Sequence, residues 1–223
     1  AASPSTGVNT VTGEGVPEAL TGARVVIDVS NSTSFLDTAV LEFFETSTRN
    51  LLAAAAATSV QHYVALSVVG TDRLAESGYF RAKLAQERLI RESGLPYTIV
   101  HATQVFEFLG GIADAASDGK AVRLAPAFVQ PMAAADVAKG VSRAALGAHA
   151  NGVVEVAGPE AFRLDEMVRE ELRARNDPRV VITDPHARYF GAPLHVCTLV
   201  PSASANLGAT HFADWLTQIT LQR

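Results

Sequence analysis

The sequence predicts an α/β fold with a parallel sheet, because short apolar runs alternate with longer amphipathic segments along the chain. Two features of the composition agree with a folded domain of this kind. The 223 residues are 48% hydrophobic, which is enough for one sizeable core and too apolar for a disordered chain. Only 18% of the residues are charged, against about 25% in a typical domain. We therefore expect much of the surface to be buried or to meet another chain.

The first half of the chain is expected to contain three strands separated by helices. Residues 24–29 are a nearly continuous β-branched run, which is typical of a strand buried on both faces. Over residues 37–58 apolar side chains recur at i, i+3 and i+4, which predicts a helix. Residues 62–69 and 97–101 are the next two predicted strands, and a helix is predicted over residues 78–92.

After Gly119 the predicted elements become shorter and less regular. A helix at residues 105–117 precedes this part of the chain. Beyond Gly119 we expect strands at residues 121–124, 152–156 and 180–183, and helices at residues 134–146, 164–174 and 209–220. No linker is long or polar enough to separate two domains. We therefore predict a single domain over residues 1–223, with a sheet core at 1–118 that carries the site and a small C-terminal α/β lobe at 119–223 on the substrate side of the same sheet.

Three polar residues form a candidate catalytic group. Tyr79 and Lys83 are four residues apart on a predicted helix, so they lie on the same face one turn apart. Ser67 stands at the carboxyl end of a predicted strand, where ligands bind in parallel α/β sheets. A nearby ammonium stabilises a phenolate and lowers its pKa from about 10 toward the range in which proton transfer is efficient. The group therefore predicts proton transfer to a carbonyl as a hydride arrives, or from an alcohol as a hydride leaves.

The sequence around these residues resembles the short-chain dehydrogenase/reductases, and among them the atypical NAD(P)-binding group that includes NmrA-like proteins. The resemblance covers nearly the whole chain. It rests on residues 48–54 (TRNLLAA), 66–70 (LSVVG), 77–83 (SGYFRAK), 94–100 (GLPYTIV) and 136–138 (DVA). It implies a Rossmann-like, doubly wound parallel sheet. It also implies an oxidoreductase that uses NAD or NADP to act on a small carbonyl or alcohol.

The resemblance also implies roles for individual residues. Ser67 would orient the substrate and Tyr79 would be the acid or base. Lys83 would lower the pKa of the tyrosine and bind the nicotinamide ribose, and Asn50 would support the lysine through water. The implied cofactor contacts are Ser30, Asn31, Lys83, His101 and Thr103, and the implied substrate contacts are Val68, Phe106 and Phe108.

The family holds the cofactor's diphosphate on a glycine-rich turn after its first strand, and the glycine pair near the start of this sequence does not match that turn. Glu14 lies between Gly13 and Gly15, and Glu18 occupies the third glycine position, so two carboxylates would face a diphosphate. We expect this stretch to be a loop that leads into a helix with Pro17 in its first turn.

Compared with the family, the sequence lacks about one strand–helix–strand unit at its N-terminus, and this predicts an unpaired sheet edge. The strand from Arg24 to Val29 would have neighbours on one side only, which leaves N–H and C=O groups open on the other. We expect a homodimer that forms around this edge, either by strand pairing or by exchange of elements.

Two other functions remain open at this point. Ser67 beside a tyrosine whose pKa Lys83 lowers is also a nucleophile–base pair, so the chain could be a cofactor-independent carboxylic ester hydrolase. The sequence has no G-x-S-x-G elbow, which disfavours a conventional hydrolase. The other alternative is a non-catalytic, NmrA-like sensor that binds a dinucleotide or a partner chain.

Charge, cysteine content and histidine spacing disfavour several other classes of protein. The net charge of −5 does not favour nucleic-acid binding, which requires a basic patch. Cys197 is the only cysteine, so an intramolecular disulfide is impossible and a cytoplasmic location is favoured. No apolar run approaches the roughly 20 residues of a membrane span. The spacing of His186 and His195 matches no metal motif. We expect no metal and a small-molecule substrate.

Overall fold

The computed structural model describes residues 1–34 and 36–221 and contains a five-stranded sheet in the order β1-β2-β3-β6-β11. These strands are β1 (Val25–Asp28), β2 (His62–Val68), β3 (Tyr97–Ala102), β6 (Gly152–Ala157) and β11 (Asn206–Leu207). The β1–β2 and β6–β11 pairs are parallel. The predicted α/β fold with a parallel central sheet is therefore confirmed.

Three two-stranded sheets accompany the central one. They are the parallel pair β4 (Ala121–Leu124) with β8 (Val180–Thr183), and the antiparallel pairs β5 (Phe128–Val129) with β7 (Phe162–Arg163) and β9 (Arg188–Tyr189) with β10 (Ala192–Pro193). The sequence predicted β4 and β8. It missed β5, β7, β9, β10 and β11, because a strand of two residues is too short to show alternation.

The helices follow the predicted order closely. They are α1 (Val16–Leu20), α2 (Asp37–Ala56), α3 (Gly78–Glu92), α4 (Leu109–Ala115), α5 (Ala134–Leu146), α6 (Leu164–Ala174) and α7 (Phe212–Leu221), with the 3-10 turns η1 (Pro4–Thr6), η2 (Thr71–Arg73) and η3 (Phe106–Phe108). The helix predicted from residue 105 is wrong in its first part, because Val105 pairs with Met132 and η3 follows before α4 begins. In the residues that the structure describes, no helix is long and apolar enough to cross a membrane.

The chain forms two compact units, and each takes in separate stretches of the sequence. Unit 1 comprises residues 1–67, 78–101 and 141–154, and unit 2 comprises residues 68–77, 102–140 and 155–223. The boundary expected at residue 118 falls inside unit 2. The division into a sheet core and a C-terminal lobe therefore stays a prediction.

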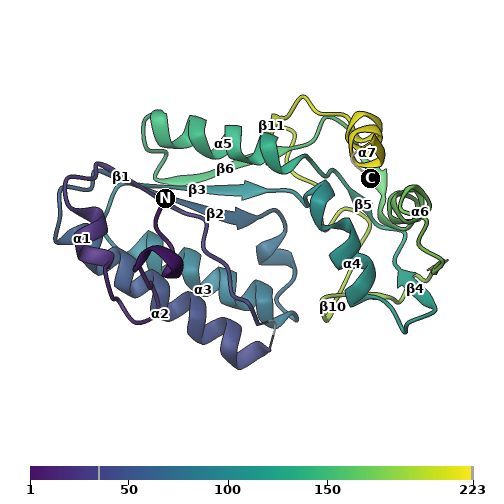
Figure 1. Ribbon diagram of the computed structural model, residues 1–223, viewed down its shortest axis with the longest axis horizontal. Coiled ribbons are helices and arrows are strands. Elements are labelled where there is room, and N and C mark those ends of the chain that lie inside the picture. Colours follow the sequence, from purple (N-terminus) through teal and green to yellow (C-terminus); the bar gives the residue numbers. More distant parts are fainter. Residues whose placement is uncertain (35, 222–223) are drawn as a thin grey trace. The chain divides into compact units, whose positions relative to one another are not determined.

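In unit 1, helices α2 and α3 lie side by side on one face of β1, β2 and β3 (Figure 1). The repeat of apolar side chains on α2 puts Leu51 and Ala55 on the face that packs against the sheet, where they meet Val26 and Tyr63. This cluster is the apolar core of the unit. Ile90 of α3 belongs to the same cluster, which fixes that helix, with Tyr79 and Lys83 on it, against the strands.

Strand β1 lies at the edge of the sheet and has one buried and one exposed face. Val26 and Asp28 are buried, whereas Val25 is 38% exposed and Ile27 is 47% exposed. The expectation of a strand buried on both faces is therefore wrong. Val26 packs against the apolar face of α2, and its neighbours along the strand point away from that helix.

The aromatic side chains of unit 2 make up part of its core. Phe106 is completely buried, and its ring centroid lies 5.4 Å from those of both Phe212 and Trp215. The hairpin of β9 and β10 turns through Phe190 and Gly191, which both have positive φ, at +46° and +89°. This combination suits a two-residue hairpin turn, although a phenylalanine rarely adopts it.

Candidate active site

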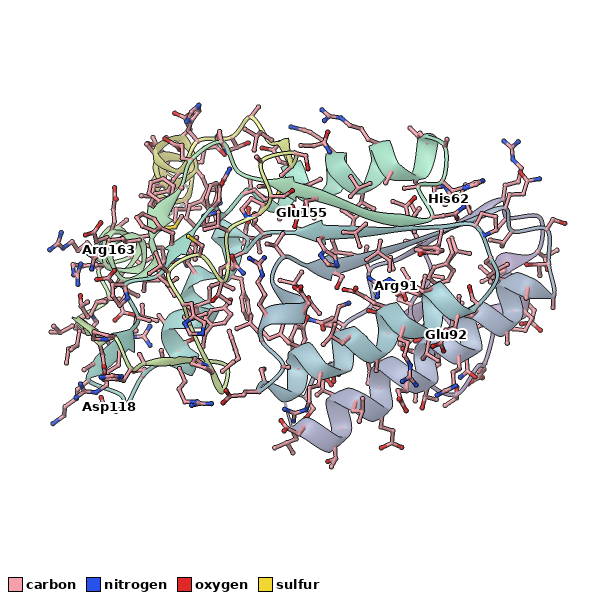
Figure 2. The ribbon with its side chains drawn as sticks, turned by 180° about the vertical axis from the view of Figure 1, so that it is seen from behind. His62, Arg91, Glu92, Asp118, Glu155 and Arg163 are labelled. Atoms are coloured by element: carbon pink, nitrogen blue, oxygen red, sulfur yellow. The ribbon has the colours of Figure 1, made fainter. Side chains whose placement is uncertain are left out.

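Ser67 lies near the carboxyl end of β2 and is buried against helix α3. Its Oγ donates a hydrogen bond of 2.6 Å to Oε1 of Glu87, which is also buried. Nε2 of His101, on β3, is 2.8 Å from the same oxygen, and Arg91 donates to Oε2 of Glu87 at 2.7 Å. Figure 2 labels Arg91 on α3, one turn beyond the glutamate. The hydroxyl proton of Ser67 is therefore bonded to a carboxylate of the chain.

The neighbours of Glu87 keep it ionised. Burial alone would raise the pKa of this carboxyl. Hydrogen bonds and charge from His101, with smaller contributions from Ser67 and Arg91, outweigh burial and lower the pKa below its usual value. Glu87 was not among the site residues predicted from the sequence. A usable signal was present, because Glu87 follows Lys83 by four residues and so lies on the same face of α3.

Lys83 is completely enclosed in a network within unit 1. Its Nζ donates to the carbonyl of Leu66 at 2.8 Å and makes a short hydrogen bond to Oε1 of Gln86. The ammonium also lies 4.5 Å from the centroid of the Phe44 ring. Burial lowers the pKa of Lys83 to about 8, against the smaller raising effects of Asp28 and Glu87. The lysine thus joins α3 to the end of β2.

Asp28 is the anionic end of this network. Nε2 of Gln86 donates to its Oδ2 at 3.0 Å and Tyr63 donates to the same oxygen at 2.9 Å. Both the amide and the hydroxyl of Ser30 donate to Oδ1, at 3.0 and 2.6 Å. Gln86 therefore bridges a buried carboxylate and a buried ammonium, which satisfies both charges without direct contact.

Tyr79 shares the helix with Lys83, and both side chains contact the ring of Phe44, but the hydroxyl of Tyr79 bonds to a different group. Its hydroxyl is 3.4 Å from Oδ1 of Asn31, and its ring packs edge-on against Phe44 and Phe80. Burial raises the pKa of Tyr79 to about 12. This direction is opposite to the lowering that the family resemblance implies. In the protein by itself, Tyr79 is a neutral phenol.

Asn50 holds a loop onto helix α2. Its Nδ2 donates to the carbonyls of Thr10 and Val11, at 2.9 and 3.0 Å. This amide is thus used to fix the first loop of the chain. The support of Lys83 through water, which the resemblance implies for Asn50, stays a prediction.

The predicted cofactor contacts differ in how far the chain satisfies them. In unit 1, Ser30 is bonded to Asp28, His101 to Glu87 and Asn31 to Tyr79. In unit 2, the hydroxyl of Thr103 is buried and has no hydrogen-bond partner among the described residues. Thr103 therefore fits a contact to a bound group. No cluster of three metal-binding side chains occurs in the described residues.

The predicted substrate contacts, all in unit 2, have different environments. Val68 ends β2, and its carbonyl accepts a hydrogen bond of 2.6 Å from the Thr71 hydroxyl. Phe106 is fully buried in the aromatic core, whereas Phe108 is 40% exposed and stacks on Phe190 at 6.1 Å with an angle of 16° between the rings. Of the two phenylalanines, only Phe108 presents its ring to solvent.

The glycine pair near the start of the chain forms an ordinary turn. Gly13 and Gly15 have φ of +81° and +69°, and a Cβ at Gly15 would collide with the carbonyl oxygen of Gly7. The close approach that this glycine permits is made to the chain's own backbone. Helix α1 follows directly with Pro17 in its first turn, as predicted.

Comparison with known proteins identifies the family. Residues 7–146 match the NAD(P)H-binding family, and the chain belongs to it. A curated relative is the photosystem II assembly factor Ycf39 of Cyanophora paradoxa, which is 32% identical over 98 residues. That match covers 44% of this chain and 30% of the relative, so the aligned part spans less than a third of that protein.

Solved structures of three enzymes share the fold, and two of them, DesIV and WbmH, have NAD bound. The dTDP-glucose 4,6-dehydratase DesIV of Streptomyces venezuelae superposes with a TM-score of 0.67 at 14% identity, over 92% of this chain and 74% of that one. The Bordetella bronchiseptica enzyme WbmH superposes with a TM-score of 0.61 at 18% identity, over 80% of this chain and 68% of that one. The NADPH-dependent quinone oxidoreductase QOR2 of Escherichia coli superposes with a TM-score of 0.57 at 22% identity, over 77% of this chain and 58% of that one. These likenesses confirm the Rossmann-like fold.

Proposed function

We propose that the chain is an NAD(P)-dependent oxidoreductase of the short-chain dehydrogenase/reductase type that reduces a small carbonyl compound. The observation that carries this proposal is the match of residues 7–146 to the NAD(P)H-binding family. Bound NADH or NADPH would supply the hydride. Thr103, with its buried and unpartnered hydroxyl, is the described cofactor contact that best fits a bound group.

Tyr79 is the proposed proton donor. A phenol with a pKa of about 12 stays protonated at neutral pH, so it can give a proton to the oxygen of a carbonyl that is becoming an alkoxide. At this pKa the phenolate, the form that removes a proton from an alcohol, is scarcely populated at neutral pH. We therefore propose that carbonyl reduction is the reaction to assay first.

Ser67 and Lys83 are proposed to position the reacting groups. The hydroxyl proton of Ser67 is bonded to Glu87, which leaves the lone pairs of its Oγ to accept a hydrogen bond from the hydroxyl of the alcohol that forms. Lys83 holds the carbonyl of Leu66, the residue before Ser67, and so fixes the end of β2. In this proposal the lysine acts on the geometry of the site.

The test combines cofactor binding with turnover. NADPH or NADH fluorescence should change on binding, and a set of small aldehydes and ketones should include one that is reduced. Tyr79→Phe should lower kcat about 100-fold, the scale of general acid catalysis, while the Kd for the cofactor stays the same. Tyr97→Phe is the matched control, because Tyr97 begins β3, at the end of the strand opposite to Thr103. This variant should retain full activity. Equal activity of Tyr79→Phe and wild type would refute the role of Tyr79.

A second candidate, a dinucleotide-binding sensor without catalysis, is favoured by one observation. Ser67 bonds to Glu87, Tyr79 to Asn31, and Lys83 to Leu66 and Gln86, so these hydrogen bonds share no partner. Cofactor binding without reduction of any carbonyl would support the sensor.

The ester hydrolase alternative has less support. The proton of Ser67 lies toward Glu87, and the lowered pKa of that carboxyl makes it a weak base. Turnover of p-nitrophenyl butyrate without cofactor, lost in Ser67→Ala, would favour the hydrolase over both other functions.

We further propose a cytoplasmic homodimer in which the β1 edges of two copies meet. The exposed side chains of Val25 and Ile27 on this edge strand support the proposal. Light scattering at micromolar concentration tests it, and a monomeric mass would refute it.

A further inference from the structure

Gln104 is a buried side chain whose amide is unused. It follows strand β3 by two residues and is 6% exposed. Neither its Oε1 nor its Nε2 has a hydrogen-bond partner among the described residues. A buried polar group without partners destabilises the folded state, and most such groups in proteins are satisfied. An apolar side chain of similar size would suit this position better if the residue had only a packing role.

The backbone around Gln104 is held from both sides within unit 2. The amide of Thr103 donates to the carbonyl of Val156 at 3.1 Å, and the amide of Met132 donates to the carbonyl of Gln104 at 2.9 Å. Val105 continues the pairing with Met132. The amide of Thr103 and the carbonyl of Gln104 are therefore both used, whereas neither polar atom of the Gln104 side chain is.

A second glutamine of the same unit shows the ordinary arrangement. Nε2 of Gln130 donates to the carbonyl of Gly158 at 2.8 Å. The segment that contains Gln130 runs on to Met132, which pairs with Gln104. Unit 2 can thus satisfy a glutamine amide nearby and leaves that of Gln104 unsatisfied.

The place and chemistry of the amide indicate what it would bind. Gln104 stands just beyond the carboxyl end of a parallel strand, where ligands bind in sheets of this kind. An amide offers donors on one atom and an acceptor on the other in a single plane. A carboxylate would satisfy Nε2 but would leave Oε1 facing another acceptor. A group with adjacent C=O and N–H satisfies both atoms at once.

We propose that Gln104 binds the amide group of a ligand, a carboxamide or lactam, through a pair of hydrogen bonds. This inference deepens the proposed function, on which it rests for the kind of ligand concerned. The amide has two possible sources, which are the carboxamide of the nicotinamide cofactor and an amide-bearing substrate. The chemistry of recognition is the same for both.

The first test is thermal stability without ligand. Gln104→Leu removes two unsatisfied polar atoms and should raise Tm by about 2–4 °C, the shift expected in a chain of this size for 1 kcal/mol. Gln104→Met, which is unbranched, is the second variant in case the leucine does not fit. Gln130→Leu is the matched control and should lower Tm, because it removes a hydrogen bond to Gly158. A lower Tm for both Gln104 variants would overturn the proposal.

The second test is binding, measured by calorimetry or thermal shift, and it needs no turnover. For the cofactor source, wild type should bind NADP⁺ about tenfold more tightly than the 3-acetylpyridine analogue, in which a methyl group replaces the NH₂. For the substrate source, wild type should bind benzamide more tightly than acetophenone, with the dinucleotide absent or present. The preference should disappear in Gln104→Leu.

These outcomes separate the two proposals. A preference for NADP⁺ over its 3-acetylpyridine analogue, or for benzamide over acetophenone, supports the site if it is lost in Gln104→Leu. The pair that shows the preference identifies the source of the amide. Equal binding of amide and ketone in both pairs overturns it. If no carbonyl compound is reduced, the proposed oxidoreductase fails while the amide preference and the stability result still stand.

Discussion

Two buried glutamines, one in each unit, occupy opposite situations. Gln86 in unit 1 uses both ends of its amide, since it accepts from Lys83 and donates to Asp28. Gln104 in unit 2 uses neither end. Both side chains are almost fully buried, at 1% and 6% exposed. The difference shows that burial alone does not reveal a role. The polar groups of α3 complete a network within the chain, whereas the amide after β3 is left for something else to complete.

The largest expected effect comes from breaking the network at Glu87. Glu87→Ala would leave Ser67, His101 and Arg91 without their shared acceptor, and we expect a loss of about 3–5 kcal/mol in the free energy of unfolding. Urea unfolding measures this loss. A loss below 1 kcal/mol would mean that the network does not hold α3 to the sheet.

Glu92 on the same helix, labelled in Figure 2, is the matched control for that variant. It forms an exposed ion pair with Arg88 at 3.6 Å. Glu92→Ala should change the free energy of unfolding by less than about 0.5 kcal/mol, since exposed pairs contribute little.

The comparison of the two glutamines predicts effects of opposite sign. Gln86→Leu would leave the ammonium of Lys83 and the carboxylate of Asp28 each without one hydrogen-bond partner. We therefore expect the free energy of unfolding to fall by about 2 kcal/mol. Gln104→Leu should instead gain stability. Denaturant curves of the two variants, recorded together, give the sign directly. A loss of stability in both variants would mean that the amide of Gln104 is satisfied in the folded protein.

A pH dependence is expected in unit 2, at a buried carboxyl whose hydrogen bonds are satisfied within the chain. Asp136 accepts from the amides of Ala209 and Thr210 and from Nζ of Lys139. Burial raises the pKa of this carboxyl, but the hydrogen bonds from Lys139 and Thr210 outweigh it and lower the pKa to about 2. The stabilisation is therefore complete above the unfolded pKa of about 3.8 and is lost as pH falls toward 2.

The matching variant is Asp136→Asn. Between pH 5 and pH 2 the free energy of unfolding of the wild type should fall by about 2 kcal/mol more than that of this variant, because the asparagine side chain does not titrate. Urea unfolding across this pH range measures the difference. Parallel curves for the two proteins would contradict the assignment.

The sequence predicted the elements well because their apolar patterns are long. The bounds of α3, α5, α6, β4 and β8 agree with the structure residue for residue. The candidate site was harder to predict. Spacing placed Tyr79 and Lys83 on one helix face, but it does not say which neighbour a long side chain reaches, and the lysine reaches Leu66 and Gln86.

The same limit applies to Phe106 and Phe108. They are two residues apart in the sequence, and nothing local distinguishes the one that packs against Phe212 and Trp215 from the one that is open to solvent. Tertiary packing decides between them. Gln104 was visible only as a residue at a strand end, since a missing hydrogen bond cannot be read from a sequence.

The interleaving of the two units bears on how the chain folds during synthesis. Unit 1 includes residues 141–154, so it has all of its parts only after the ribosome has released residue 154. At about 5–20 residues per second, the early strands and helices wait for several seconds before their last partners arrive. During that interval β3 lacks its neighbour β6 in the sheet, together with the hydrogen bonds that join Asn151 to Tyr97. A chaperone that holds nascent chains would therefore have its effect before this point, and slower translation after residue 101 would lengthen the exposure.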